Sequence, residues 1–125
     1  MPCPRGPAPC GAGADTLALA LGRAADAAVP APCYLETCML LTGRGGVDGR
    51  PVVDDLLETF GVRILPLTDT HARLAVDAFL RYGKGRHPAA LNFGDCISYA
   101  VARAETRPLL FAGTDFCQTD VAQAI

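Results

Sequence analysis

Short apolar runs alternate with segments of helical periodicity along this sequence, and that alternation constrains the fold more than any other feature. Residues 62–67 read VRILPL, a β-branched and apolar run with Pro66 at its exit, and residues 108–111 form a second strand candidate. Strands separated by helices predict an α/β fold with a short, mostly parallel sheet. In such folds functional side chains gather at the carboxyl ends of the strands.

Five segments carry helical signals. They cover about residues 15–28, 34–42, 52–60, 69–82 and 93–105. Pro30 and Pro32 are expected to close the first helix, because proline interrupts the helical hydrogen bonds. Thr68 is a cap for the fourth helix and Gly83 its end. We expect His71, in the first turn of that helix, at the surface.

The chain divides near residue 14. Residues 1–13 contain four prolines and three glycines, so they cannot form a continuous hydrogen-bonded strand or helix, and we interpret them as an unstructured arm. Residues 14–125 suit one small domain with a single core.

Composition narrows the class of protein. No apolar stretch approaches the roughly 20 residues of a membrane-spanning helix, and the start of the chain lacks the pattern of an export signal, which predicts a cytoplasmic protein without a membrane segment. The formal net charge of -2 provides no general attraction for nucleic acid, so any RNA contact needs a local basic patch. Cys38 and Cys96 lie in apolar segments and read as core thiols.

Three acidic residues stand out by their settings, each with two interpretations. Glu36 lies in the apolar segment YLETCMLL and is either a site residue or a glutamate on an exposed helix face. Asp95 follows Asn92 by three residues, which fits a capping box as well as a ligand at a helix start. Asp115 follows the last strand candidate and is either a ligand or a turn residue, and Asp120 repeats that ambiguity.

Convergence of the three acids would have a chemical consequence. Carboxylates at close range repel one another unless they are protonated or neutralised by a cation. A hard divalent ion with oxygen ligands is the natural occupant of such a cluster.

Three blocks of the sequence carry a specific resemblance. YLET at 34–37, YGKGRHPAALNFGDCISYAVA at 82–102 and PLLFAGTDFCQTDV at 108–121 follow one another in the order seen in PIN-domain ribonucleases of the VapC toxin type. The region from residue 33 to residue 125 resembles that family. The resemblance implies a three-layer, Rossmann-like PIN domain.

The resemblance also implies a function. The family consists of Mg²⁺-dependent endoribonucleases that hydrolyse RNA as toxins of bacterial toxin–antitoxin pairs, with Mn²⁺ as a chemically suitable alternative ion. It implies an RNA substrate, a VapB-like antitoxin, and a homodimer or a toxin–antitoxin hetero-oligomer.

The resemblance assigns roles to particular residues. Metal binding and catalysis fall to Glu36, Asp95 and Asp115, and supporting roles fall to Asn92, Thr114 and Asp120. Lys84, Arg86 and His87 form a basic loop that either positions RNA phosphates or is simply solvated.

The start of the chain departs from the family pattern. PIN domains begin with a short apolar strand that ends in an acid and lies in the middle of the sheet, whereas this chain carries the proline-rich arm there. Asp15 is preceded by no strand and aligns better with the following helix. We therefore expect an N-terminally incomplete domain whose first central strand is missing or replaced. Its loss would weaken metal binding and leave neighbouring strands without hydrogen-bond partners.

Three functional hypotheses remain open at this level. The chain is an active ribonuclease, or an inactive and N-terminally truncated PIN-like protein that only binds an antitoxin through its apolar helices. The third hypothesis is a small-molecule-binding α/β domain with a chance cluster of acids, for which the sequence offers no glycine-rich phosphate loop.

Overall fold

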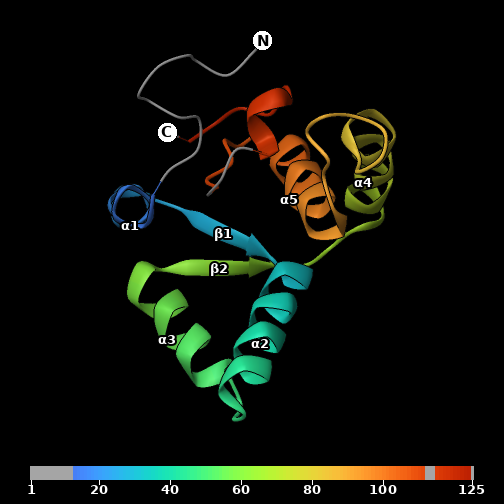
Figure 1. Cartoon of the computed structure of the whole chain (residues 1–125). Coiled ribbons are helices and arrows are strands. Elements are labelled where there is room, and N and C mark those ends of the chain that lie inside the picture. Colours follow the sequence, from blue (N-terminus) through green and yellow to red (C-terminus); the bar gives the residue numbers. More distant parts are fainter. Residues whose placement is uncertain (1–12, 112–114, 125) are drawn as a thin grey trace.

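The computed structural model describes residues 13–111 and 115–124 and has a mixed α/β architecture (Figure 1). In chain order its elements are α1 Ala14–Arg23, β1 Ala27–Pro30, α2 Ala31–Gly45, α3 Arg50–Phe60, β2 Val62–Leu65, α4 Asp69–Tyr82, α5 Phe93–Ala104 and a 3-10 helix, η1, at Asp115–Gln118. The predicted α/β class with parallel strands is confirmed.

The sheet consists of β1 and β2, which run parallel. Ala27 lies opposite Val62, and Pro30 lies opposite Leu65. The connection between the two strands passes through α2 and α3, which lie on one side of the strands, while α5, with α4 packed against it, lies on the other (Figure 1). This arrangement brings the start of α2, directly after β1, towards α5.

The first predicted helix is wrong at its C-terminal end. The helix α1 stops at Arg23, and residues 27–30 form β1 instead of continuing the helix to residue 28. Two interactions outweigh the helix propensity of the alanines. The residue before a proline is driven towards extended backbone, which favours a strand at Val29 before Pro30. Asp26 is also held by ion pairs with Arg63 and Arg107, whose guanidinium groups lower the pKa of its carboxyl, the hydrogen bond from Arg63 first.

The other predicted helices are confirmed, with α2 longer at both ends than predicted. Gly61 ends α3 in the left-handed conformation at φ 64°, which a residue with a Cβ adopts only with strain. The hydroxyl of Thr68 caps α4 by accepting a hydrogen bond from the backbone N–H of His71 at 3.2 Å.

The prediction of a strand at residues 108–111 is also wrong, because the segment forms no continuous strand. Its ladder is reduced to a single parallel bridge between Leu109 and Gln123, within the described residues. The N–H of Leu109 donates to the carbonyl of Ala122 at 2.7 Å, and the carbonyl of Leu109 accepts from the N–H of Ala124 at 2.9 Å. A longer strand would need a longer partner segment than residues 122–124 provide, and β1 does not pair with this segment.

The core lies between α4, α5 and the C-terminal segment. Its buried side chains are Ala78, Tyr82, Ala89, Leu91, Cys96, Tyr99, Ala102, Phe116 and Val121. Cys38 and Cys96 are buried free thiols, as predicted. His71, expected at the surface, is instead 4% exposed. Its Nδ1 accepts from the N–H of Thr68 and its Nε2 lies 3.3 Å from Glu105, so the ring joins the start of α4 to the end of α5.

None of the helices in the described part of the chain combines the length and the apolar composition that crossing a membrane would require.

Candidate active site

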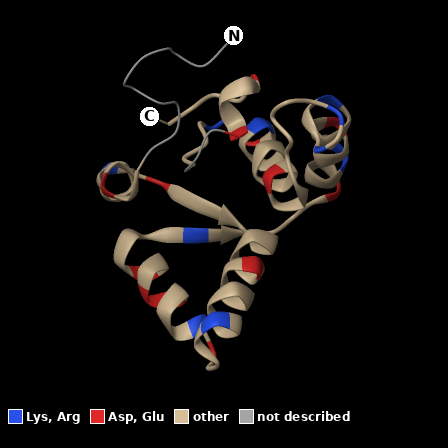
Figure 2. Ribbon diagram, in the orientation of Figure 1, with Lys and Arg blue, Asp and Glu red and all other residues tan. Residues whose placement is uncertain are grey.

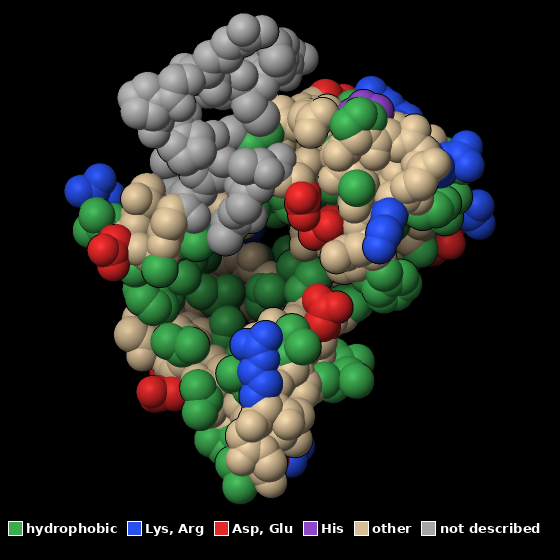
Figure 3. Space-filling view, in the orientation of Figure 1, with side chains coloured by type: hydrophobic (Ala, Val, Ile, Leu, Met, Phe, Trp, Pro, Cys, Tyr) green, Lys and Arg blue, Asp and Glu red, His purple; other side chains and the backbone are tan. Residues whose placement is uncertain are grey.

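Three elements position the predicted acids. Glu36 lies in the second turn of α2, Asp95 in the first turn of α5, and Asp115 at the start of η1. Glu36 and Asp115 are exposed, and Asp95 is half-buried. Acidic side chains lie on opposite sides of a hollow in the face shown in Figure 3.

The Glu36 carboxylate reaches the first turn of α5 because Gly94 has no side chain. A Cβ added to Gly94 would lie 3.0 Å from Oε1 of Glu36 and 3.6 Å from Oδ1 of Asn92. The space beside Gly94 is therefore filled by the end of the Glu36 side chain. Sequence reasoning missed this contact, although a glycine inside the first helical turn of LNFGDC was a usable signal, because glycine disfavours helix.

Asp95 serves the helix cap and faces the other acids at the same time. Its Oδ2 accepts a hydrogen bond from the backbone N–H of Asn92 at 3.1 Å, and the Asn92 side chain accepts from the N–H of Asp95 at 2.9 Å. This reciprocal capping box was one of the two interpretations of the sequence. It fixes the carboxyl group and engages one of its two oxygens.

Electrostatics tie the three acids together. Burial raises the pKa of Asp95, the hydrogen bond from Asn92 counteracts this, and the negative charges of Asp115 and Glu36 raise the pKa further. The same carboxylates act on Cys33, where burial raises the thiol pKa, the Ser98 hydroxyl at 3.4 Å lowers it, and the charges of Glu36 and Asp95 raise it. Negative charge thus accumulates where α2 meets α5.

The chemistry of this cluster fits a hard divalent cation, since it offers carboxylate oxygens from three elements whose mutual repulsion a cation would relieve. Its geometry is looser. Within residues 13–111 and 115–124, no three His, Cys, Asp or Glu side chains lie close enough together to hold a metal ion as they stand. The carboxylate oxygens therefore suit a divalent cation, but the described carboxylates lie too far apart to bind one ion together.

The predicted supporting residues have different settings. Asn92 caps α5, and Thr114 lies outside the described residues. Asp120 accepts hydrogen bonds from the Tyr99 hydroxyl and from Arg103, the latter at 2.8 Å, and pairs with Arg81 at 3.5 Å. Burial tends to raise the pKa of Asp120, but these donors and the two arginine charges outweigh it and lower the pKa.

The hydrogen bond between Tyr99 and Asp120 also changes the pKa of the tyrosine. Burial first, and then the hydrogen bond to Asp120, raise the pKa of Tyr99 to about 12. Tyr99 is buried, and its hydroxyl donates to the Asp120 carboxylate.

Two of the three residues in the predicted basic loop make contacts within the fold. Arg86 donates from Nε to the carbonyl of Leu80 at 3.2 Å, and the His87 ring packs edge-on against Tyr82 at 5.0 Å between centroids. The Lys84 side chain is exposed, and within the described residues it makes no hydrogen bond or ion pair. Basic and acidic residues occur on several of the described elements (Figure 2).

Comparison with known proteins places the chain in a family. The model of the PIN domain matches residues 12–122. The chain is 44% identical over 108 residues to Ribonuclease VapC36 of Mycobacterium tuberculosis, a match that spans 86% of this chain and 78% of that protein. It is 40% identical over 113 residues to Ribonuclease VapC42 of the same species, over 90% of this chain and 86% of that protein.

A relative from another genus extends the comparison. Ribonuclease VapC of Mycolicibacterium smegmatis is 45% identical over 89 residues, which cover 71% of this chain and 69% of that protein. The blocks that resemble VapC proteins, the match to the domain model and these identities agree. The chain belongs to the PIN-domain family, among the VapC ribonucleases.

Proposed function

We propose that this chain is a metal-dependent endoribonuclease that hydrolyses RNA phosphodiester bonds as the toxin of a VapBC-type pair. The observation that carries the proposal is the accumulation of Glu36 and Asp115 charge on a capped, half-buried Asp95. It occurs in a chain whose relatives are named ribonucleases. A carboxylate in that setting is expected to attract a cation, and we propose Mg²⁺, with Mn²⁺ as an alternative.

Each of the three acids has a proposed role that follows from the element on which it lies. Asp95 is the fixed ligand, because the capping box holds its carboxyl group against the start of α5. Glu36 approaches from α2 through the space that Gly94 leaves open, and Asp115 closes the site from η1. When bound, a divalent ion orients and helps to deprotonate the attacking water and neutralises charge on the scissile phosphodiester.

Other residues are proposed to support the site. Asn92 sets the start of α5, and Asp120 holds the same helix in place through Tyr99 and Arg103 one and two turns further on. Thr114 is proposed to orient its neighbour Asp115. Lys84 is exposed and follows the bridge between Gly83 and Leu91 that leads to Asn92, so it is the residue of the basic loop best placed to contact an RNA phosphate. Arg86 and His87 are proposed as further contacts in the same loop.

The domain and its partners form part of the same proposal. Residues 14–125 would form a single three-layer PIN-like domain, and β1 and β2 form its sheet within the described residues. The arm expected at residues 1–13 lies, apart from Gly13, outside the described residues. The protein would act in the cytoplasm. A VapB-like antitoxin would cover the apolar side chains exposed on α2 and α3, which are Leu35, Met39, Leu40, Val52 and Leu56. A homodimer or a toxin–antitoxin hetero-oligomer would be the working assembly.

One observation favours a second candidate. The described acids are too far apart to hold a metal ion as they stand, which fits an inactive PIN-like protein that only binds an antitoxin. Such a protein would form the complex and leave RNA intact.

The experiment compares three chains under the same conditions. Cleavage of a structured RNA in Mg²⁺ is measured for the unaltered chain, for Asp95→Asn, whose amide oxygen can still accept the cap hydrogen bond, and for Asp55→Asn on the exposed face of α3. We expect cleavage that needs Mg²⁺, is lost in Asp95→Asn and persists in Asp55→Asn, with equal circular dichroism spectra. Folded but inactive chains that still bind an antitoxin would select the second candidate.

A further inference from the structure

A hydrogen bond joins α2 to α5 beside the acid cluster. The Cys33 thiol lies 3.4 Å from the Ser98 hydroxyl in a part-buried position, and either group can be the donor. Within the described part of the chain, no other side-chain hydrogen bond joins these two helices. Because α2 carries Glu36 and α5 carries Asp95, this bond ties together the elements that bring two of the acids to the site.

The sequence spacing places this bond about one turn away from the acid on each helix. Cys33 precedes Glu36 by three positions in α2, and Ser98 follows Asp95 by three positions in α5. Side chains three positions apart in a helix lie on the same face. The bond and the two carboxylates therefore lie along the faces by which α2 and α5 meet.

The charges of the two acids act to separate the helices at these faces. Negative charge from Glu36 acts on Asp95, and like charges at close range repel one another. The capping box fixes Asp95 on α5, whereas the place of Glu36 depends on where α2 lies. Burial raises the pKa of the Cys33 thiol, so the thiol stays protonated. Its bond with Ser98 therefore opposes the separation and adds no charge to the site.

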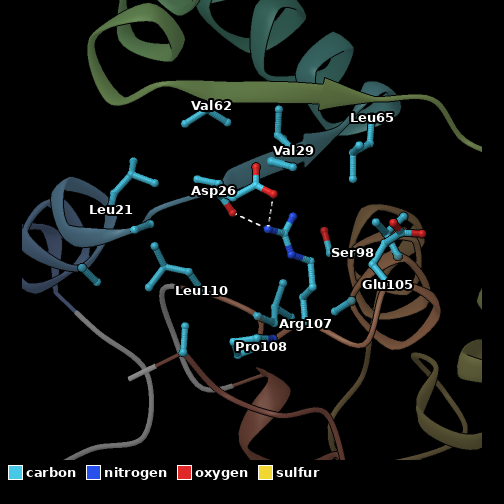
Figure 4. A pocket seen from close by; sticks show the side chains of 18 of the residues that line it. Leu21, Asp26, Val29, Val62, Leu65, Ser98, Glu105, Arg107, Pro108 and Leu110 are labelled. Carbon is cyan, nitrogen blue, oxygen red and sulfur yellow. Dashed lines mark hydrogen bonds and ion pairs between the residues drawn. The ribbon is translucent and has the colours of Figure 1, made fainter.

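The bond also lies where the chain passes from the sheet into α2. Ser98 lines a cavity of about 850 Å³, whose walls include Val29 and Pro30 of β1 (Figure 4). The helix α2 begins at the next residue, Ala31, so Cys33 lies in its first turn. A bond at this place fixes the start of α2 against α5, one turn before Glu36.

We propose that Cys33 and Ser98 are positioning residues for the metal site. Their bond, which we call the thiol–hydroxyl link, sets the spacing of α2 and α5 and thereby holds the Glu36 carboxylate beside the first turn of α5. The benefit to metal binding rests on the proposed function, whereas the effect on the place of Glu36 does not. Groups that orient metal ligands without touching the ion typically contribute roughly tenfold to 100-fold to metal affinity.

Variants of the full chain separate the link from the general stability of α2. Cys33→Ala and Ser98→Ala each remove the link from one side, and Cys33→Ser keeps a hydrogen-bonding group in its place. Tyr34→Phe is the matched control, because it removes the 2.6 Å hydrogen bond from Tyr34 to Asp54, which joins the same helix to α3. This control loosens α2 without removing its bond to α5.

The first measurement needs neither metal nor RNA. In the isotope-labelled, metal-free chain, nuclear Overhauser effects between the side-chain protons of Glu36 and the α-protons of Gly94 report the contact of these two residues. We expect these signals in the unaltered chain, in Cys33→Ser and in Tyr34→Phe, and their loss in the two alanine variants. Unchanged signals in either alanine variant would overturn the proposal. Unfolding of both alanine variants would make the link a requirement of the fold and would overturn it too.

The second measurement is a calorimetric titration of the same chains with Mn²⁺. We expect the alanine variants to bind Mn²⁺ about tenfold more weakly than the unaltered chain, and Cys33→Ser and Tyr34→Phe to bind it equally well. Equal affinity in all four variants, or a loss in Tyr34→Phe as large as in Cys33→Ala, would overturn the proposal. An unaltered chain that binds no Mn²⁺ would contradict the proposed function instead, and the proton contacts alone would then decide whether the link positions Glu36.

Discussion

Replacing Gly94 with alanine separates the stability of α5 from the function of the site. The added Cβ would lie 3.0 Å from Oε1 of Glu36, against 3.4–4 Å for an ordinary contact. The Glu36 side chain is exposed and flexible, so its carboxylate can move away at little cost to the fold. Alanine in place of glycine in a helix stabilises by roughly 0.5–1 kcal/mol. Gly94→Ala should therefore raise the free energy of unfolding by up to about 1 kcal/mol.

The same substitution should damage the site. Moving a catalytic group by about 1 Å can cost roughly 100-fold in rate, so we expect RNA cleavage in Mg²⁺ to fall by about tenfold to 100-fold. Urea unfolding measures the first effect and initial cleavage rates measure the second. The control is Gly43→Ala in α2, where an added Cβ meets no atom within 4 Å and should change only stability. Cleavage by Gly94→Ala at the unaltered rate would refute the placement of Glu36 at this turn.

Three further predictions concern protonation and packing. Burial and the charges of Asp115 and Glu36 raise the pKa of Asp95, so the metal-free protein should lose stability as pH rises through that raised pKa. Millimolar Mg²⁺ should then raise the Tm at pH 7 for the unaltered chain but not for Asp95→Asn. Tyr99, Arg103 and Arg81 lower the pKa of Asp120, so its contribution to stability is present above pH ~4 and is lost as pH falls through the lowered value. Asp120→Asn should flatten that part of the acid unfolding curve. His71→Ala removes buried contacts to Thr68 and Glu105 and should lower the free energy of unfolding by about 1–3 kcal/mol in urea titrations, whereas an unchanged value would contradict its structural role.

The parts of the fold that depend on local sequence were predictable. The caps at Thr68 and Asn92 act over a few residues, and the structure shows both. The strand β1 was missed because its partner, Val62–Leu65, lies more than thirty positions away and local composition favoured helix. The strand expected at 108–111 was over-predicted for the converse reason, since a strand needs a neighbour that composition does not reveal.

In the site, too, features that depend on local sequence were predictable, and features that depend on distant packing were not. The three acids were predicted as site residues from their local settings together with a family resemblance, and their metal-binding role stays a prediction. The capping role of Asp95 was one of the alternatives considered, and the structure shows it. The contact of Glu36 with Gly94 and the burial of His71 depend on packing between helices that are distant in sequence. The ion pairs that tie Asp120 to Arg81 and Arg103 depend on the same kind of packing.

The most direct test of the central claim is a calorimetric titration of Mn²⁺ into the unaltered chain and into Glu36→Gln, Asp95→Asn and Asp115→Asn, with Asp55→Asn as the control. If the three carboxylates hold the ion together, each of the three variants should bind Mn²⁺ roughly tenfold or more weakly than the unaltered chain, and the control should bind equally well. Unchanged affinity in Asp95→Asn, or no binding by the folded unaltered chain, would contradict the account.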